Sequence, residues 1–380
     1  MEARKMYKIV PVMLCYFVMG FVDIVGVSTG YAQRDFNLSP ELAQLIPSMV
    51  FVWFFILSIP VGVLQNNYGK RKLLLLGVFI TALGMCAPFI LYSYGSLLLC
   101  FVLLGIGNTI IQVSVNPLLQ DVVSKGRFSS YMSLSQFIKA ISSLLGPVLV
   151  TFFVGWFSDW KYILVFYGIT SIICGVWLMM TPIAEVRSET KASFMTTLRL
   201  LKNKFIASMV LAIFLIVGLD VGMNTNIQNL LIQKFDISLE KASLGISIYF
   251  FALMISRFFG AILLSKVDNL KFLLWSSVLT IGAIVLTIFS PSSFLAYIFI
   301  FLVGLSSGNL FPLIFSLTIA KFPERSSEIS GLMIMAVVGG AIIPPIMGVV
   351  NNYFGVSLSF VVLLACAVYV LGSYFIIKSN

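Results

Sequence analysis

Twelve long apolar runs constrain what this chain can fold into. They span roughly residues 8–30, 43–67, 72–92, 95–118, 132–154, 160–180, 204–230, 243–265, 271–290, 293–319, 329–351 and 356–377. A membrane-spanning helix needs about 20 mostly apolar residues, whereas a strand of a membrane β-barrel has about ten residues of alternating polarity. Because residues 72–92 are apolar all round, the sequence predicts an all-α membrane protein with twelve transmembrane helices.

The composition agrees with this class and excludes several kinds of chemistry. Of the 380 residues, 60% are hydrophobic and 10% are charged, against roughly 45–50% and 25% in soluble domains. The chain has no histidine, and its five cysteines lie singly in apolar runs. An imidazole base, a metal-ligand cluster and a Cys-x-x-Cys motif are therefore missing, so we expect no enzymatic activity, no metal and no cofactor.

Lysines and arginines fall mostly on one side of the predicted spans. Of the 24, eighteen lie in tails and loops on the side of the N-terminus and four lie on the other side. Cytoplasmic loops are enriched in these residues, so both termini are expected in the cytoplasm, with the protein in a bacterial inner membrane. The net charge of +10 then belongs to loops beside anionic lipid and does not indicate nucleic acid. The first run lacks a cleavage site, which favours a retained helix over a signal peptide.

The two halves of the chain resemble each other at an offset of about 197–201 residues. Asp23 is matched by Asp220, Gly107-Asn108 by Gly308-Asn309, and Arg127 by Arg325. The hydrophilic stretch between them predicts a six-helix bundle over residues 1–180, a cytoplasmic linker over 181–203 and a second bundle over 204–380. Such repeats are typical of transporters that rock one half against the other. A duplicated channel or scaffold is disfavoured because the matched residues include charges inside the membrane.

Several motifs in their order along the chain carry a family resemblance. They are Gly62-Val-Leu-Gln-Asn66-Asn67-Tyr-Gly69-Lys70-Arg71 after the second span, Gln112-Val-Ser-Val-Asn116-Pro117 in the fourth, Gln136-Phe137 in the fifth, Ser256-Arg257-Phe-Phe-Gly260 in the eighth and Gly339-Gly340 through Pro344-Pro345 to Gly348 in the eleventh. Together they resemble the major facilitator superfamily, and within it the branch of fucose and glucose/galactose permeases. The resemblance implies sugar uptake by alternating access, driven by a cation gradient that is usually of protons.

Two departures from the family pattern bear on the site. Asn66 and Asn67 stand where the superfamily loop has an Asp-Arg pair, and this replacement argues against a charge relay through that pair. Asn66, Lys70 and Arg71 of the same loop are expected to have gating or structural roles. Gln112 stands where some relatives carry a glutamate, and an amide cannot titrate. Proton coupling through position 112 is therefore excluded.

Four ionisable residues lie inside predicted spans, namely Asp23, Lys139, Asp220 and Arg257. Each costs on the order of 3 kcal/mol or more at mid-membrane and is a functional hypothesis by default. A carboxylate in a cavity of low dielectric constant takes up a proton more readily, so Asp23 is the predicted main proton site, with Asp220 beside it. Arg257 is expected to have a gating or structural role. The alternative is that all four form ion pairs that hold helices in register.

Amide side chains offer both donors and acceptors for a hydroxyl-rich ligand. The residues predicted to bind substrate are Asn108, Gln112, Gln136, Lys139, Asn224, Gln228 and Asn309. The alternative is hydrogen bonding between helices, which is expected first of Asn116. Trp53, Tyr249 and Phe311 are weaker candidates for stacking on a sugar ring.

The substrate charge depends on Lys139. Gln112 does not neutralise it, so its ammonium could receive a substrate carboxylate, which would indicate a uronate or sialic acid. It could also reach Asp23 or extend to the headgroups. We therefore expect a monomeric proton-coupled sugar symporter that contacts membrane lipid, with sodium coupling or a sugar acid as alternatives. An exporter of drugs or metabolites has the same fold but favours a greasier cavity, and a sensor usually carries a cytosolic domain.

Overall fold

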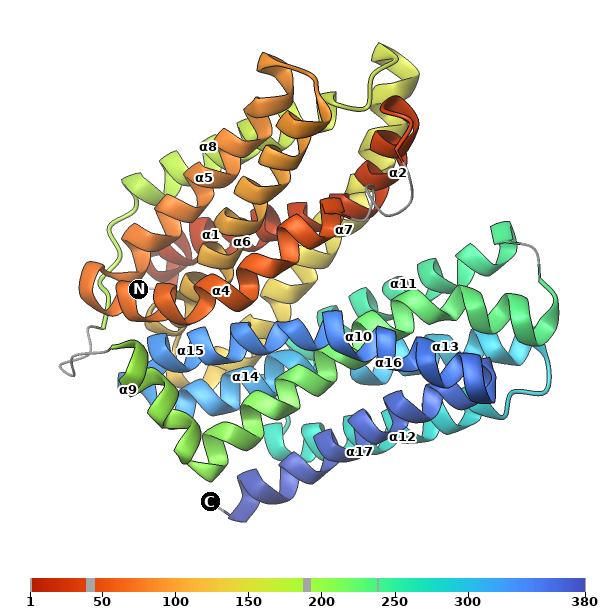
Figure 1. Ribbon diagram of the computed structural model, residues 1–380. Coiled ribbons are helices and arrows are strands. Elements are labelled where there is room, and N and C mark those ends of the chain that lie inside the picture. Colours follow the sequence, from red (N-terminus) through yellow and green to blue (C-terminus); the bar gives the residue numbers. More distant parts are fainter. Residues whose placement is uncertain (1, 39–44, 187–192, 238, 380) are drawn as a thin grey trace. The chain divides into compact units, whose positions relative to one another are not determined.

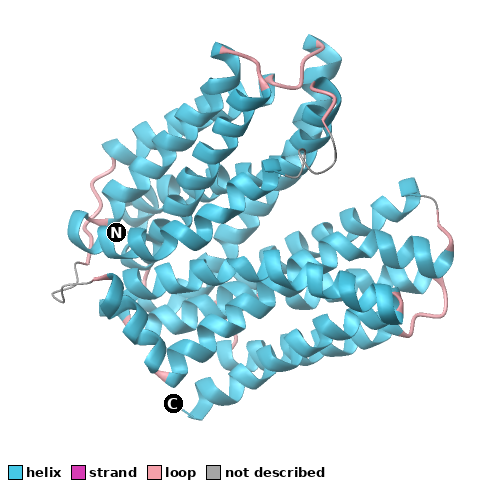
Figure 2. Cartoon of the chain, in the orientation of Figure 1, coloured by secondary structure: helices cyan, strands magenta, loops and turns pink. Residues whose placement is uncertain are grey.

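The computed structural model describes residues 2–38, 45–186, 193–237 and 239–379. Every regular element within these ranges is a helix (Figure 2). Twelve helical spans among them are long and apolar enough to cross a membrane, and each overlaps one of the twelve predicted runs. The predicted fold class is confirmed, and the chain is an integral membrane protein that crosses the bilayer many times.

The helices follow one another in the order shown in Figure 1. Those before the linker are α1 (Glu2–Met19), η1 (Gly20–Ile24), α2 (Val25–Asp35), α4 (Leu45–Tyr68), α5 (Lys70–Ile90), α6 (Tyr94–Val122), η2 (Lys125–Arg127), α7 (Phe128–Phe157) and α8 (Tyr162–Met180), followed by α9 (Phe194–Arg199) and η3 (Leu200–Lys202). Those after it are α10 (Lys204–Phe235), α11 (Leu239–Leu263), α12 (Asn269–Ile288), α13 (Ser293–Ser307), α14 (Leu310–Lys321), η4 (Pro323–Arg325), α15 (Ser326–Met335), η5 (Ala336–Val338), α16 (Gly339–Phe354) and α17 (Val356–Ser379).

Several helices begin where a polar side chain caps the first turn. The side-chain oxygens of Ser93, Asn203, Asp268 and Ser292 accept backbone N–H groups at the starts of α6, α10, α12 and α13. These N–H groups have no partner within the helix. The caps therefore fix the boundaries of the spans at the membrane surface.

Three of the predicted spans are interrupted. The 3₁₀ segment η1 separates α1 from α2, Gly308 and Asn309 separate α13 from α14, and η5 separates α15 from α16. The apolar runs predicted each of these as one unbroken helix, because hydropathy does not register a local change of backbone. Within a membrane, irregular backbone is tolerated only where protein buries it or where it lines a cavity. Asp23, Asn309 and the preceding Gly308 lie at such breaks.

Contacts divide the chain into two compact units. One holds residues 1–125, 138–197 and 322–335, and the other holds 126–137, 198–321 and 336–380. In the first, α6 packs on α4 and α5; in the second, α10 packs on α16 and α17. Close helix approach needs small residues: a Cβ on Gly77 of α5 would lie 2.8 Å from the Gly107 carbonyl oxygen of α6. The bundle boundaries predicted from the repeat remain a prediction.

Candidate functional site

A row of buried amides runs along α6 and joins it to α1. The Asn108 amide donates to the Met19 carbonyl (2.8 Å), and the Gln112 amide donates to the Asn108 side-chain oxygen (2.8 Å). Asn116 donates to the Gln112 carbonyl (2.9 Å) and accepts from the Tyr16 hydroxyl (2.7 Å). The row ends at Met19, directly before the break that carries Asp23. The expected interhelical role of Asn116 is confirmed.

Asp23 projects from η1 and is the exposed residue of an otherwise buried turn. The Ser143 hydroxyl of α7 is hydrogen-bonded to the Asp23 carboxylate and lies 3.0 Å from the Lys139 carbonyl oxygen. The backbones approach closely at this crossing, since a Cβ on Gly20 would lie 2.8 Å from the Lys139 carbonyl. The structure therefore brings Asp23 and Lys139 to one helix crossing.

The charges at this crossing are not joined as an ion pair. The ion pairs among the described residues are Arg34–Asp35, Lys70–Asp121 and Lys161–Asp159. None of the four charges predicted inside the membrane has an opposite charge within 4.0 Å in that part of the chain. The alternative in which they are structural ion pairs finds no support in this arrangement.

In the other unit, Asp220 of α10 accepts a hydrogen bond from the Tyr249 hydroxyl of α11 (2.7 Å). The Tyr249 ring is fully buried, so it is not placed to stack on a sugar in this conformation. Asn224 and Gln228 follow Asp220 at intervals of four residues, which puts all three on one face of the helix. Each is half-buried, so this polar face is partly open.

Asn309 lies in the break between α13 and α14 and is buried. Its amide donates to the Ser256 carbonyl (2.6 Å) and hydroxyl (2.9 Å), and its oxygen accepts from Ser133. Arg257 donates to the Gly308 carbonyl (3.3 Å) at the same break. These contacts hold α7, α11 and α14 together. Gln136 is 5% exposed and has no hydrogen-bond partner among the residues that the structure describes.

The loop after α4 forms a buried electrostatic cluster. Lys70 pairs with Asp121 of α6 at 2.7 Å, with both side chains nearly inaccessible. The Glu185 carboxylate accepts hydrogen bonds from the backbone N–H groups of Lys70 (2.6 Å) and Arg71 (3.3 Å) and so caps the beginning of α5. The preceding residue, Gly69, has a φ of 96°. The Arg71 guanidinium donates to two carbonyls at the end of α8. Asn66 is half-buried near the end of α4.

The profile of the Major Facilitator Superfamily matches residues 12–227 and 209–378, which together cover nearly the whole chain. The chain belongs to this superfamily. It is 23% identical over 383 residues to the glucose/galactose transporter of Brucella abortus, covering 96% of this chain and 92% of the relative. It is 26% identical over 358 residues to a putative glucose/galactose transporter of Helicobacter pylori, covering 89% and 87%.

Solved structures of the superfamily share the fold of this transporter. The Escherichia coli fucose:proton symporter FucP superimposes with a TM-score of 0.83 over 98% of this chain and 99% of FucP, at 18% sequence identity. The proton:xylose symporter XylE superimposes with a TM-score of 0.78 over 97% and 95%, at 13% identity. At these identities the likeness establishes the fold.

Some residues of the site were not predicted from the sequence of this transporter. Ser143 at Asp23, Asp121 at Lys70 and Glu185 at the start of α5 were missed. Serine is common in membrane helices and carries no signal of its own. Asp121 could have been found, because it is an acid at the predicted inner end of the fourth span, on the same predicted side of the membrane as the Lys70 loop.

Proposed function

We propose that this protein takes up a neutral hexose together with protons by alternating access. The similarity to glucose/galactose transporters supports glucose or galactose as the substrate, and the structural likeness to the proton symporters FucP and XylE supports proton coupling. We further propose that it acts as a monomer in a bacterial inner membrane with both termini in the cytoplasm, as the distribution of lysine and arginine indicates.

The observation that carries proton coupling is the environment of Asp23. Its carboxylate lies in a break of the first span, is exposed, and contacts a hydroxyl but no cation among the described residues. A carboxylate paired with a cation would hold its charge throughout the cycle. Without such a pair, protonation of Asp23 changes the net charge of the site. The free-energy cost of closing the transporter around the site is then higher when Asp23 is ionised than when it is protonated, because burial of a charge is costly.

The Ser143 hydroxyl can follow this change, since its one proton has two acceptors. When Asp23 is ionised, Ser143 donates to the carboxylate. When Asp23 is protonated, the acid donates to the Ser143 oxygen, and Ser143 donates to the Lys139 carbonyl. Protonation of Asp23 thereby adds a hydrogen bond to the backbone carbonyl of Lys139 on α7, while the proton stays on Asp23.

The test is transport in proteoliposomes with an imposed pH gradient. Asp23→Asn should abolish uphill accumulation of labelled glucose or galactose but keep counterflow exchange, which needs binding and alternation without net proton movement. Asp236→Asn is the matched control, because Asp236 is exposed at the end of α10 in a left-handed conformation (φ 53°) that asparagine also adopts. Uphill accumulation by the Asp23 variant at the wild-type level would refute the proposal.

A sugar acid is the second candidate, favoured by the absence of an ion pair at Lys139 among the described residues. A substrate carboxylate would form an ion pair with the Lys139 ammonium and neutralise its charge. Competition of uptake by glucose against glucuronate separates the two. Inhibition by the neutral sugar alone, unchanged in Lys139→Gln, supports the hexose, and inhibition by glucuronate that is lost in this variant supports the acid.

A further inference from the structure

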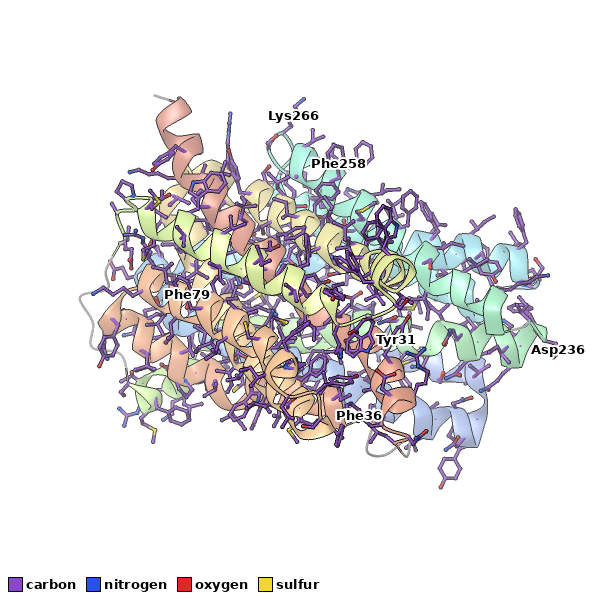
Figure 3. The ribbon with its side chains drawn as sticks, turned by 90° about the horizontal axis from the view of Figure 1, so that it is seen from above. Tyr31, Phe36, Phe79, Asp236, Phe258 and Lys266 are labelled. Carbon is purple, nitrogen blue, oxygen red and sulfur yellow. The ribbon has the colours of Figure 1, made fainter. Side chains whose placement is uncertain are left out.

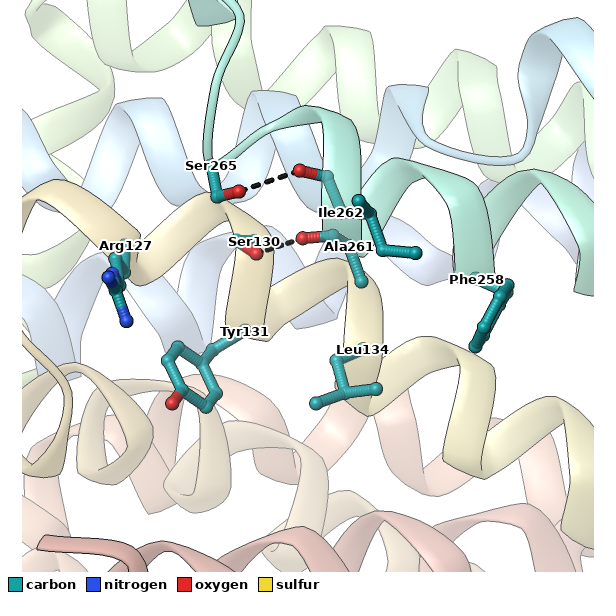
Figure 4. Close-up of a pocket in the computed structure, with 8 residues that line it drawn as sticks. All are labelled: Arg127, Ser130, Tyr131, Leu134, Phe258, Ala261, Ile262 and Ser265. Carbon is teal, nitrogen blue, oxygen red and sulfur yellow. Dashed lines mark hydrogen bonds between the residues drawn. The ribbon is translucent and has the colours of Figure 1, made fainter. Parts of the chain in front are cut away.

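A groove opens between the beginning of α7 and the end of α11, outside all of the predicted transport residues (Figure 4). Its volume is about 350 Å³. The walls are formed by Arg127, Ser130, Tyr131 and Leu134 on one side and by Phe258 and Ile262 on the other, with Ser265 at the end of α11. Both walls belong to the same compact unit.

The groove is polar at one end and apolar along its length. Along the first wall, the side chains from the polar end are the Arg127 guanidinium, the Tyr131 phenol and Leu134. Along the second wall, they are Ser265, Ile262 and Phe258. Positions three and four apart share a helix face. The polar end lies at the loops that carry Arg127 and Lys266, on the side predicted to be cytoplasmic. Figure 3 labels Phe258 of the apolar wall and Lys266 in the loop after α11.

Two donors at the polar end are free. Within the described residues, neither the Arg127 guanidinium nor the Tyr131 hydroxyl forms a hydrogen bond or ion pair. The nearby serines are already engaged, because Ser130 donates to the Ala261 carbonyl and Ser265 donates to the Ile262 carbonyl (2.6 Å). A ligand at this end would therefore be recognised by Arg127 and Tyr131.

Comparison with the second half of the internal repeat shows that the absence of an acidic neighbour at Arg127 is a feature of the first half. Arg325 is the repeat counterpart of Arg127, and Glu328 occupies the position that corresponds to Ser130. Glu328 lies close enough to Arg325 for the two charges to interact. In the first half Ser130 has no charge, so it does not neutralise Arg127 as Glu328 partly neutralises Arg325. The positive charge of Arg127 can therefore attract an external anion.

We propose that this groove binds an anionic phospholipid of the cytoplasmic leaflet. The phosphate of the lipid lies on the Arg127 guanidinium, which can bind two phosphate oxygens at once. The phosphate also accepts a hydrogen bond from the Tyr131 hydroxyl. An acyl chain follows Leu134, Phe258 and Ile262, of which Phe258 is 42% and Ile262 is 45% exposed. Basic pockets between membrane helices on the cytoplasmic side suit anionic headgroups, and the apolar wall selects a lipid over a free phosphate.

A lipid in this position contacts both α7 and α11 beside the bond from Ser130 to the Ala261 carbonyl. It contacts both walls only while the two helices are together. A ligand that binds one conformation better shifts the population toward it. An anionic lipid should therefore favour the conformation in which the beginning of α7 lies on the end of α11.

The test is binding of phosphatidylglycerol and phosphatidylcholine to the purified full-length protein by native mass spectrometry. We expect Arg127→Gln to weaken binding of phosphatidylglycerol about tenfold, the loss of one charge-assisted contact, and Tyr131→Phe to weaken it less. The matched control is Lys72→Gln, which removes an exposed cation at the beginning of α5, outside the groove. It should change binding little.

Three results would overturn the proposal. If Lys72→Gln weakens binding of phosphatidylglycerol as much as Arg127→Gln does, the lipid is attracted by net charge alone. If the wild type binds phosphatidylcholine as tightly as phosphatidylglycerol, the site does not recognise the negative charge. Displacement of the lipid by millimolar glycerol phosphate would indicate a site for a soluble phosphate. Thermal unfolding of each variant in detergent confirms that it is folded. Binding is measured without transport, so its failure is distinguishable from failure of the proposed sugar uptake.

Discussion

At the scale of single residues, the Ser143 hydroxyl of α7 is hydrogen-bonded to the Asp23 carboxylate. It also lies 3.0 Å from the Lys139 carbonyl oxygen. A hydrogen bond to a charged acceptor contributes about 1.5–3 kcal/mol. Removal of the hydroxyl should therefore take away the link between the Asp23 carboxylate and the backbone of α7.

We therefore expect Ser143→Ala to lower uphill sugar uptake about tenfold, as measured in proteoliposomes with an imposed pH gradient, and to keep counterflow exchange. Ser143→Thr keeps the hydroxyl and should retain the wild-type rate. The control is Ser142→Ala, because the neighbouring Ser142 hydroxyl is buried and has no partner among the described residues. Uphill uptake by Ser143→Ala at the wild-type rate would contradict a role of Ser143 in the coupling.

At the scale of elements, buried charges fix how the ends of helices meet. The Lys70–Asp121 pair joins the beginning of α5 to the end of α6 with both side chains nearly inaccessible. Removal of one partner leaves a buried charge uncompensated, which costs about 3–5 kcal/mol, whereas replacement of both by apolar residues is often neutral.

Asp121→Asn should accordingly lower the thermal stability of the detergent-solubilised protein strongly, by the equivalent of about 3 kcal/mol. Lys70→Met combined with Asp121→Leu should recover most of this loss. Thermal unfolding followed by tryptophan fluorescence measures both. A single variant as stable as the wild type would mean that the pair does not hold α5 and α6 together.

A second element, α2, is held at its end by the Asp35 carboxylate, which accepts from the Tyr92 hydroxyl (2.7 Å) and the Trp160 indole (3.0 Å). Partial burial raises the pKa of Asp35, but the hydrogen bonds from Tyr92, Trp160 and Arg34 outweigh it, so its pKa lies below the ordinary value. A lowered pKa in the folded protein contributes stability above the ordinary pKa, and this contribution is lost as the pH falls through the lowered pKa.

Asp35→Asn should destabilise the protein by about 1 kcal/mol at pH 7, because the site is partly exposed. The difference from the wild type should shrink below about pH 4, where Asp35 of the unfolded chain is protonated. Thermal unfolding of both proteins between pH 3 and 7 measures this. A difference that stays constant over that range would exclude the charge of Asp35 as its cause.

At the scale of the whole molecule, hydroxyl and amide contacts with backbone carbonyls join segments from the two predicted halves. Ser133 donates to the Arg257 carbonyl (2.7 Å), and Gln65 donates to the Ser327 carbonyl (3.0 Å). Each such bond contributes only about 1 kcal/mol net, so helices joined in this way can separate during a transport cycle. At the second contact, a Cβ on Gly331 of α15 would lie 2.7 Å from the Ser58 carbonyl of α4.

Gly331→Val should therefore force α15 away from α4 and favour the conformation in which these helices are apart. We expect loss of net uptake and faster labelling of a cysteine placed at Asn224 by thiol reagents added from the inside, in a background without native cysteines. The control is Gly372→Val, since nothing lies within 4 Å of a Cβ built on Gly372. Equal labelling rates in the two variants would contradict the role of this contact.

The sequence by itself determined the twelve spans, the membrane class and the residue types that a coupled sugar carrier needs. Those features are local: the length of an apolar run, the sign of a loop and the cost of a charge at mid-membrane can each be read from adjacent residues. The motif order also indicated the superfamily that the profile match established.

Only the tertiary structure decided which of these residues meet. Ser143 and Asp23 are 120 positions apart and Lys70 and Asp121 are 51 apart, so their contacts depend on where helices cross. The breaks at η1 and at Gly308–Asn309 were likewise decided there, because neighbouring helices supply the partners that an interrupted backbone needs inside a membrane. Hydrogen bonds between distant segments follow from helix packing, and helix packing has no period along the chain.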